Sequence, residues 1–224
     1  MSIRKLSDRA IVALCATVLG GTVLAGGAHA AAILTFGQSG NGNVITGTQT
    51  GSSTTIAAID APVTISQIDA VQSTPLSGFL DMNLTSTSGA VPVADNLQQH
   101  FSGSFSITSG AGGGGTNYLS GTLIDVAFGS GSEFNLSAST PPIGSVIFTS
   151  GVITPADLTG DLGAGFSFAN VTDPLSIVDG TFASFTSSVS GTFSANISAI
   201  AEPASLALLG AGVFGMGLLR RRRA

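Results

Sequence analysis

Side chains that could perform chemistry are few in this chain of 224 residues. His100 is the one histidine after residue 30, and Cys15 is the one cysteine. A serine–histidine–aspartate triad needs a histidine base beside an activated serine, which many hydrolases present on a Gly-x-Ser-x-Gly turn. The nearest match, residues 165–169, reads Gly-Phe-Ser-Phe-Ala and lacks the second glycine. We therefore interpret His100 as an ordinary strand-end residue and predict no catalytic residue.

Metal binding would have to rely on the acidic residues. Zinc sites are built mainly from cysteine and histidine, and the chain after residue 30 offers one histidine and no cysteine. Calcium needs only oxygen ligands, and Asp157 and Asp161 flank a predicted loop. Their spacing lacks the third acid and the closing glutamate of an EF-hand. The two acids are weak calcium candidates, and we expect no cofactor.

Two carboxylates can hydrolyse a glycosidic bond when a cleft brings them together. Asp81, Asp125 and Glu133 lie in or near predicted strands, so a carboxylate-dependent hydrolase stays as an alternative. The chain has no tryptophan, and Tyr118 is its one tyrosine, so few rings could stack on a sugar. This argues against a glycan-processing cleft. Our first expectation is a protein that is not an enzyme.

Charge is divided sharply along the chain. Between residues 31 and 201 there are nine aspartates and one glutamate but no lysine or arginine. Nucleic-acid binding is excluded for this segment because phosphate contacts depend on lysine and arginine. Its negative charge also repels acidic polysaccharide, so association with an exopolysaccharide would need neutral contacts or bridging cations.

Residues 1–30 follow the plan of a secretory signal peptide. A positive start precedes an uncharged, apolar run over residues 10–25. Ala28 and Ala30 are small residues at the two positions that a signal peptidase reads, which predicts cleavage before Ala31. The alternative is an uncleaved anchor helix, but the run is short for a membrane span and glycines weaken it.

Residues 199–224 combine a short motif, an apolar run and a basic end. The motif is Ala201-Glu202-Pro203, and residues 204–219 carry no charge. As a helix this run would be roughly 24 Å long, which is shorter than the roughly 30 Å hydrocarbon core of a bilayer. The arginines that follow would stay on the cytoplasmic side of the membrane and stop the span there: Arg220, Arg221, Arg222 and Arg223.

This tail resembles the PEP-CTERM sorting signal of Gram-negative bacteria, in which a Pro-Glu-Pro motif precedes a short apolar helix and a terminal arginine cluster. Glu202 and Pro203 match the last two motif residues, and Ala201 stands where the first proline is usual. The resemblance implies processing near these residues by an exosortase, a membrane-embedded transpeptidase-like enzyme. It also implies a host that makes exopolysaccharide and exports proteins into its surface layer or biofilm.

The expected route has three steps. Signal peptidase removes the N-terminal segment, the tail anchors the chain transiently in the inner membrane, and processing delivers the protein to the cell surface or the extracellular space. The alternative for the tail is a plain one-span anchor that is retained.

Residues 31–198 are predicted to form one exported all-β domain, because polar and apolar residues alternate along several runs. We expect an antiparallel β-sandwich, with a β-helix or solenoid as the alternative. Residues 94–100 could form one short helical turn. Residues 101–108 and 189–198 alternate throughout and are predicted strands. Two other runs place a set of residues on one face, which we expect to line the core. These sets are Leu80, Met82 and Leu84 in one run, and Thr122, Ile124, Val126 and Phe128 in the other.

Glycine- and proline-rich segments mark predicted turns between these runs: 40–43, 110–115, 129–132 and 141–142. Natural edge strands usually carry charges, lysine above all, that block pairing with another chain. A domain without lysine is therefore expected to self-associate. Taken together, we expect a non-enzymatic surface or extracellular-matrix protein, with a secreted carbohydrate- or calcium-binding module as the alternative.

Overall fold

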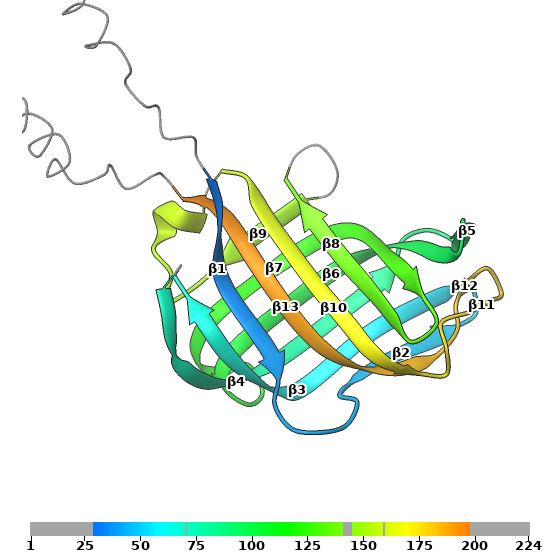
Figure 1. The fold of residues 1–224 in the computed structure, drawn as a ribbon, viewed down its shortest axis with the longest axis horizontal. Helices are drawn as coiled ribbons and strands as arrows, with labels where there is room; N and C mark the ends of the chain where they lie inside the picture. The colour runs from blue at the N-terminus through cyan, green and yellow to red at the C-terminus, as the bar shows by residue number, and fades with distance from the viewer. Residues whose placement is uncertain (1–28, 70, 141–144, 159, 198–224) are drawn as a thin grey trace, which may run out of the picture. The chain divides into compact units, whose positions relative to one another are not determined.

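Antiparallel strands make up most of the chain that the structure describes, which confirms the all-β prediction (Figure 1). The computed structural model describes residues 29–69, 71–140, 145–158 and 160–197. Its elements in chain order are β1 (His29–Gln38), β2 (Ile45–Thr50), β3 (Ser53–Ile68), β4 (Val71–Ser86), β5 (Val91–Val93), β6 (Asn96–Gly110), β7 (Gly114–Ser130), β8 (Glu133–Ser139), β9 (Ser145–Thr149), the 3₁₀ helix η1 (Pro155–Leu158), β10 (Leu162–Thr172), β11 (Ile177–Val178), β12 (Thr181–Phe182) and β13 (Phe185–Ile197).

The main sheet closes on itself through its pairings. The strand order β6-β4-β3-β1-β13-β10-β8-β7 returns to its start because β6 also pairs with β7. Where β1 ends, β2 takes its place between β3 and β13. In Figure 1, β1, β13, β10 and β8 run side by side on the near side, and β3, β4, β6 and β7 cross behind them. The two groups of strands enclose the core.

Phenylalanine rings fill the space between the two groups of strands. Phe105 of β6 stacks on Phe193 of β13 with ring centroids 4.8 Å apart. Phe134 of β8 stacks on Phe168 of β10 at 4.4 Å. Contacts between ring neighbours, some stacked and some edge to face, join ten rings in one network: Phe36, Phe101, Phe105, Phe134, Phe148, Phe166, Phe168, Phe182, Phe185 and Phe193. Such ring pairs stabilise a core beyond the area they bury.

Most of the strand predictions are confirmed. The run 101–108 lies in β6 and buries Phe101, Phe105 and Ile107, and the run from residue 189 lies in β13. The predicted core face of β4 is buried as well, at Leu80, Met82 and Leu84.

The predicted core face of β7 is wrong. Ile124 and Phe128 lie on its outer surface, and Leu119, Leu123 and Ala127 are the buried residues. The hairpin with β6 sets this register, because Phe105 pairs with Gly121 and Phe101 with Asp125. Residues directly opposite each other in an antiparallel pair point to the same face, so the odd-numbered residues of β7 face inward with the phenylalanines of β6.

The predicted turns at residues 40–43, 110–115 and 129–132 are confirmed to within a residue or two of the strand ends, and residues 141–142 lie outside the described ranges. The short helical turn expected at residues 94–100 is wrong, because β6 begins at Asn96 and β5 pairs back onto it. Within the described ranges, no helix is long and apolar enough to cross a membrane.

Gly191 is a point of close packing in β13. It pairs with Phe36 on one side and with Phe166 on the other. A Cβ at this position would lie 2.4 Å from the Phe36 ring, which is far inside van der Waals contact. Phe36 is itself held by Phe193, with ring centroids 6.1 Å apart. Because Gly191 has no side chain, the Phe36 ring can occupy this space.

Gly191→Ala should lower the free energy of unfolding by about 1–3 kcal/mol, because the added methyl overpacks the phenylalanine network. The matched control is Gly37→Ala in neighbouring β1, where a Cβ would meet nothing within 4 Å. Urea unfolding followed by circular dichroism measures both variants. Equal stability of the two variants would contradict this account of the core.

Candidate functional site

An uncharged face rich in hydroxyl groups covers β1, β13, β10 and β8. The strand register lines up outward-facing positions in rows across these strands. One row runs Thr35, Thr192, Gly165 and Ser137, and the next runs Gly37, Ser190, Ser167 and Asn135. Glu133, at the start of β8, lies at the border of this face.

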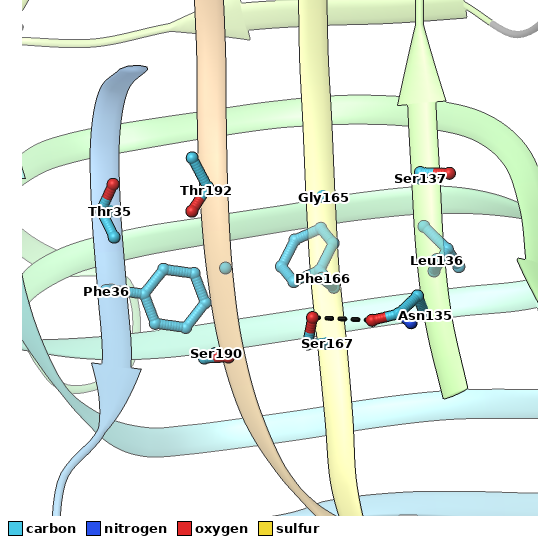
Figure 2. A pocket seen from close by; sticks show the side chains of 11 residues that line it. Thr35, Phe36, Asn135, Leu136, Ser137, Gly165, Phe166, Ser167, Ser190 and Thr192 are labelled. Atoms are coloured by element: carbon cyan, nitrogen blue, oxygen red, sulfur yellow. Dashed lines mark hydrogen bonds between the residues drawn. The ribbon is translucent and has the colours of Figure 1, made fainter. Parts of the chain in front are cut away.

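A shallow hollow of about 330 Å³ lies in the middle of this face. Figure 2 shows Thr35, Thr192, Ser190 and Ser167 around it, with the Phe36 and Phe166 rings beside them. Gly165 contributes no side chain, which leaves room between its neighbours. The hollow is therefore lined by hydroxyls, one amide, the Leu136 side chain and the Phe36 and Phe166 rings.

The hydroxyls of this face are largely free to bind something outside the protein. Ser167 donates to the side-chain oxygen of Asn135 at 2.7 Å. Among the described residues, no hydrogen bond is formed by the side chains of four others around the hollow: Thr35, Ser137, Ser190 and Thr192. Each hydroxyl can donate one hydrogen bond and accept two. The face can therefore bind neutral, hydroxyl-bearing molecules through hydrogen bonds without any ion pair.

The three acids considered for hydrolysis do not come together. Asp81 lies on the outer face of β4, Asp125 points inward from β7, and Glu133 is exposed at the start of β8. Along β7, the partner of Glu133 is Ser130, five residues from Asp125 and so roughly 16 Å away along the strand. Asp125 pairs with Phe101 of β6, and Phe101 pairs with Ser86 of β4. Ser86 is five residues from Asp81, so Asp81 and Asp125 are also separated by roughly 16 Å along the strands.

Asp81 instead supports a β-bulge in β3. The register of β3 against β4 shifts between Ala58 and Ala61, and Asp60 within the bulge has a φ of 50°. The Asp60 N–H donates to one Asp81 oxygen at 2.9 Å, and the Gly112 N–H donates to the Asp60 carboxylate. The second Asp81 oxygen is buried with no hydrogen-bond partner among the described residues. This network ties the bulge to β4 and to the β6–β7 hairpin.

Asp125 lies where β8 and β9 separate along the same edge of β7. Ile124 pairs with Ser145 of β9, and Val126 pairs with Ser137 of β8. The Asp125 carboxylate is buried and accepts the Val126 N–H at 2.6 Å. Burial raises the pKa of this carboxyl, while the backbone of Val126, the charge of His100 and the backbone of Ser139 act in the opposite direction. We interpret Asp125 as a cap for backbone groups at this fork.

A second buried polar group joins three strands that are distant in sequence. Gln99 of β6 donates to the Thr181 hydroxyl at 2.5 Å and to the Ser88 carbonyl at 2.9 Å, and its side-chain oxygen accepts the Phe182 N–H at 2.9 Å. Thr54 of β3 bonds to the Thr181 hydroxyl at 2.7 Å. Thr54, Gln99 and Thr181 have no exposed surface. Each buried group has a partner, which is what makes burial of polar side chains tolerable.

The other sequence candidates do not form a centre. His100 is exposed on β6, and its backbone N–H donates to the Ser88 hydroxyl at 3.2 Å. Asp157 lies in η1, and Asp161 is exposed just before β10. In the part of the chain that the structure describes, no three His, Cys, Asp or Glu side chains gather as metal ligands would.

The candidate sorting residues lie outside the described residues, as do Ala28 and the expected membrane segment: Ala201, Glu202, Pro203 and Arg220–Arg223. Ala30 and Ala31, on either side of the predicted cleavage, are part of β1. Comparison of the chain with models of protein families, with characterised proteins and with solved structures gives no match.

Gln99→Leu should lower the free energy of unfolding by about 2–4 kcal/mol, because it leaves the buried Phe182 N–H without its partner and removes the Gln99 hydrogen bond to the buried Thr181 hydroxyl. Gln98→Leu is the matched control, since Gln98 is half-buried and its side chain forms no hydrogen bond among the described residues. Thermal unfolding of both variants tests the difference. Similar losses in the two variants would contradict the role of the network.

The raised pKa of Asp125 predicts a pH dependence of stability. Because the folded state binds this proton more tightly than the unfolded state, the contribution is fully present below the unfolded pKa of 3.8 and is lost as the pH rises through the folded pKa. Between the unfolded and the folded pKa, the free energy of unfolding of the wild type should therefore fall relative to that of Asp125→Asn as the pH rises. The slope of this fall is at most about 1.4 kcal/mol per pH unit.

Urea unfolding at pH values from 3 upward measures the difference between the wild type and Asp125→Asn. Glu133→Gln removes one exposed carboxylate and controls for the change in net charge. A constant difference between the wild type and Asp125→Asn across the series would contradict the buried, proton-binding carboxyl.

Proposed function

We propose that the chain is an exported, non-enzymatic structural protein of the cell surface or extracellular matrix, delivered through residues 199–224. The observation that carries the proposal is the uncharged hydroxyl face of β1, β13, β10 and β8. Such a face can hydrogen-bond to neutral matrix polymers without the counter-ions that a charged surface would bring. The motif, apolar run and arginines of the tail support delivery through signal peptidase and an exosortase.

We propose further that the fold is a flattened antiparallel sandwich and not a solenoid. Two features support this. Every strand pairing among the described residues is antiparallel, and Figure 1 shows two groups of strands that cross each other. The ring of pairings would make the two layers continuous at their sides.

A neutral carbohydrate-binding module is the second candidate, favoured by the hollow of about 330 Å³ on the hydroxyl face. The proposed matrix protein and this module would use the same surface. They differ in whether one sugar segment is held tightly or many are held weakly. The separation of Asp81, Asp125 and Glu133 gives no support to the hydrolase alternative.

The protein recovered from its native host should lack both the first thirty residues and the segment beyond Glu202 when it is isolated from the extracellular or surface fraction. Intact mass spectrometry of that fraction and of the membrane fraction tests this. Replacing Arg220–Arg223 by glutamine should prevent processing, because the basic stop signal is lost. Replacement by lysine keeps the charge and is the matched control.

Retention of Arg220–Arg223 in a protein found only in the membrane fraction would identify a plain anchor and remove the support for delivery into a matrix. A mass greater than that of the processed chain would reveal a covalent modification. The chain has four Asn-x-Ser/Thr sequences at which a glycan could be attached: Asn83, Asn135, Asn170 and Asn196.

A further inference from the structure

Asn41 differs from the other asparagines of the chain in the residue that follows it. The chain has eight asparagines, and Asn41 is the one followed by glycine, whereas each of the others precedes valine, leucine, tyrosine or isoleucine. The backbone nitrogen of the next residue can attack the side-chain amide of an asparagine and form a five-membered ring. A glycine at that place has no side chain to obstruct the approach and adopts backbone angles that other residues avoid. The sequence therefore makes residue 41 the most reactive of these amides.

The loop of residues 39–44, between β1 and β2, leaves both reacting groups free. Asn41 and Gly42 are exposed, and Gly42 has a φ of 107°. Gln38 donates to the Gly42 carbonyl and accepts the Val189 N–H at 3.3 Å. Among the described residues, neither the Gly42 N–H nor the Asn41 side chain forms a hydrogen bond. Figure 1 shows this blue loop projecting beyond the end of β1, so water reaches both groups.

Asn43, two residues further along the same loop, is held where Asn41 is free. Its side-chain amide donates to the Asn170 carbonyl at 2.9 Å and to two threonine hydroxyls at 3.0 Å each. The backbone nitrogen that follows it, that of Val44, donates to the Ser187 carbonyl at 3.1 Å. Attack on the Asn43 amide would break these hydrogen bonds and bring a β-branched residue against the ring. The fold thus protects one amide of the loop and leaves its neighbour open.

We infer that Asn41 is a site of spontaneous deamidation in the folded protein, with water as the second reactant. The Gly42 nitrogen bonds to the side-chain carbonyl carbon of Asn41 and gives up its proton, and the amide nitrogen leaves as ammonia. The product is a cyclic imide, which water then opens. Breaking the bond from the Gly42 nitrogen to the side-chain carbon gives aspartate, and breaking its bond to the main-chain carbon gives isoaspartate. One water is consumed and one ammonia is released, so no oxidant or enzyme is required.

The new carboxylate would lie at the border of the hydroxyl face. A second hollow, of about 320 Å³, is lined by Gln38, by residues 40–42 and by Ser167 and Ser190, which also line the hollow at the centre of that face. Among the described residues that line the two hollows, none is charged. An aspartate has an ordinary pKa of about 3.9 and is ionised at neutral pH. Deamidation therefore brings a negative charge to a neutral surface.

This inference rests on the proposed function only for its biological setting. In a matrix protein that stays outside the cell, the product accumulates with the age of the protein, and the added charge increases its repulsion from acidic polysaccharide. A protein that is sorted and processed but keeps the Asn41 amide would overturn the inference alone. A retained membrane anchor that still deamidates would overturn only the proposed delivery.

The test is incubation of the full chain, purified in mild detergent, at mildly alkaline pH, with samples taken over time for peptide mapping by mass spectrometry. Chymotrypsin suits the domain because residues 31–201 lack lysine and arginine. The peptide that begins after Phe36 should gain the mass that separates OH from NH₂, as two isomers, and fragmentation should place the change at Asn41. Asn43, in the same peptide, should keep its amide.

Two variants test the assignment in the intact protein. Isoelectric focusing should show that the wild type gains one negative charge during the incubation. Asn41→Gln should lose this gain, because the longer side chain disfavours closure of the ring. Asn83→Gln is the matched control, since Asn83 is exposed on β4 and is followed by leucine, and it should gain the charge as the wild type does.

A parallel incubation in guanidinium chloride shows what the folded loop contributes. Asn41 should convert in both the folded and the unfolded protein. Conversion in the unfolded chain alone would mean that the loop protects the amide, and it would overturn the inference. An unchanged wild type, equal conversion at Asn41 and Asn43 in the folded protein, or an undiminished gain of charge in Asn41→Gln would overturn it as well.

Discussion

Burial of phenylalanine is the interaction on which the described structure depends most. Residues 31–201 contain no lysine or arginine, so their carboxylates cannot form lysine or arginine ion pairs among themselves. Cohesion must come from the backbone ladders and from the core. Phe166 links the two halves of the ring network, because it contacts Phe193 at 5.3 Å and Phe168 at 6.3 Å. The close approach of β13 to these rings then requires glycine at position 191.

The polar groups inside the domain lie where the ladders are interrupted. Asp125 is at the fork between β8 and β9, and Gln99 meets Thr181 at the two-residue strand β12. A short strand or a fork leaves backbone groups that no neighbouring strand can satisfy, and a buried side chain then supplies the missing partner. The same reasoning explains the Asp81–Asp60 contact at the bulge in β3. Asp81 and Asp125, two of the three acids considered for hydrolysis, are better explained as backbone supports.

The strands and turns could be predicted from alternation and from glycine clusters, but the inward face of β7 could not be predicted from alternation alone. Both phases of that strand carry apolar residues: Leu119, Leu123 and Ala127 in one, and Ile124, Val126 and Phe128 in the other. The hairpin turn at residues 111–113 was a signal for the face, but two register shifts between the turn and Phe105 also decide which residues of β7 lie opposite Phe101 and Phe105. Contacts such as Thr54 with Thr181 depend on pairings between strands far apart in the sequence, β13 with β2 and β2 with β3, which no local pattern reports.

The absence of positive charge has opposite consequences on two surfaces of the domain. On β1, β13, β10 and β8 it leaves a face of hydroxyls and glycines that water solvates well and that neutral polymers can share. At β9 it removes the lysines that ordinarily prevent one edge strand from adding to another. A soluble enzyme would gain nothing from such an edge, since uncontrolled pairing leads to aggregation. Pro92 gives β5, at the other end of the strand order, a protection against such pairing that the sequence of β9 lacks.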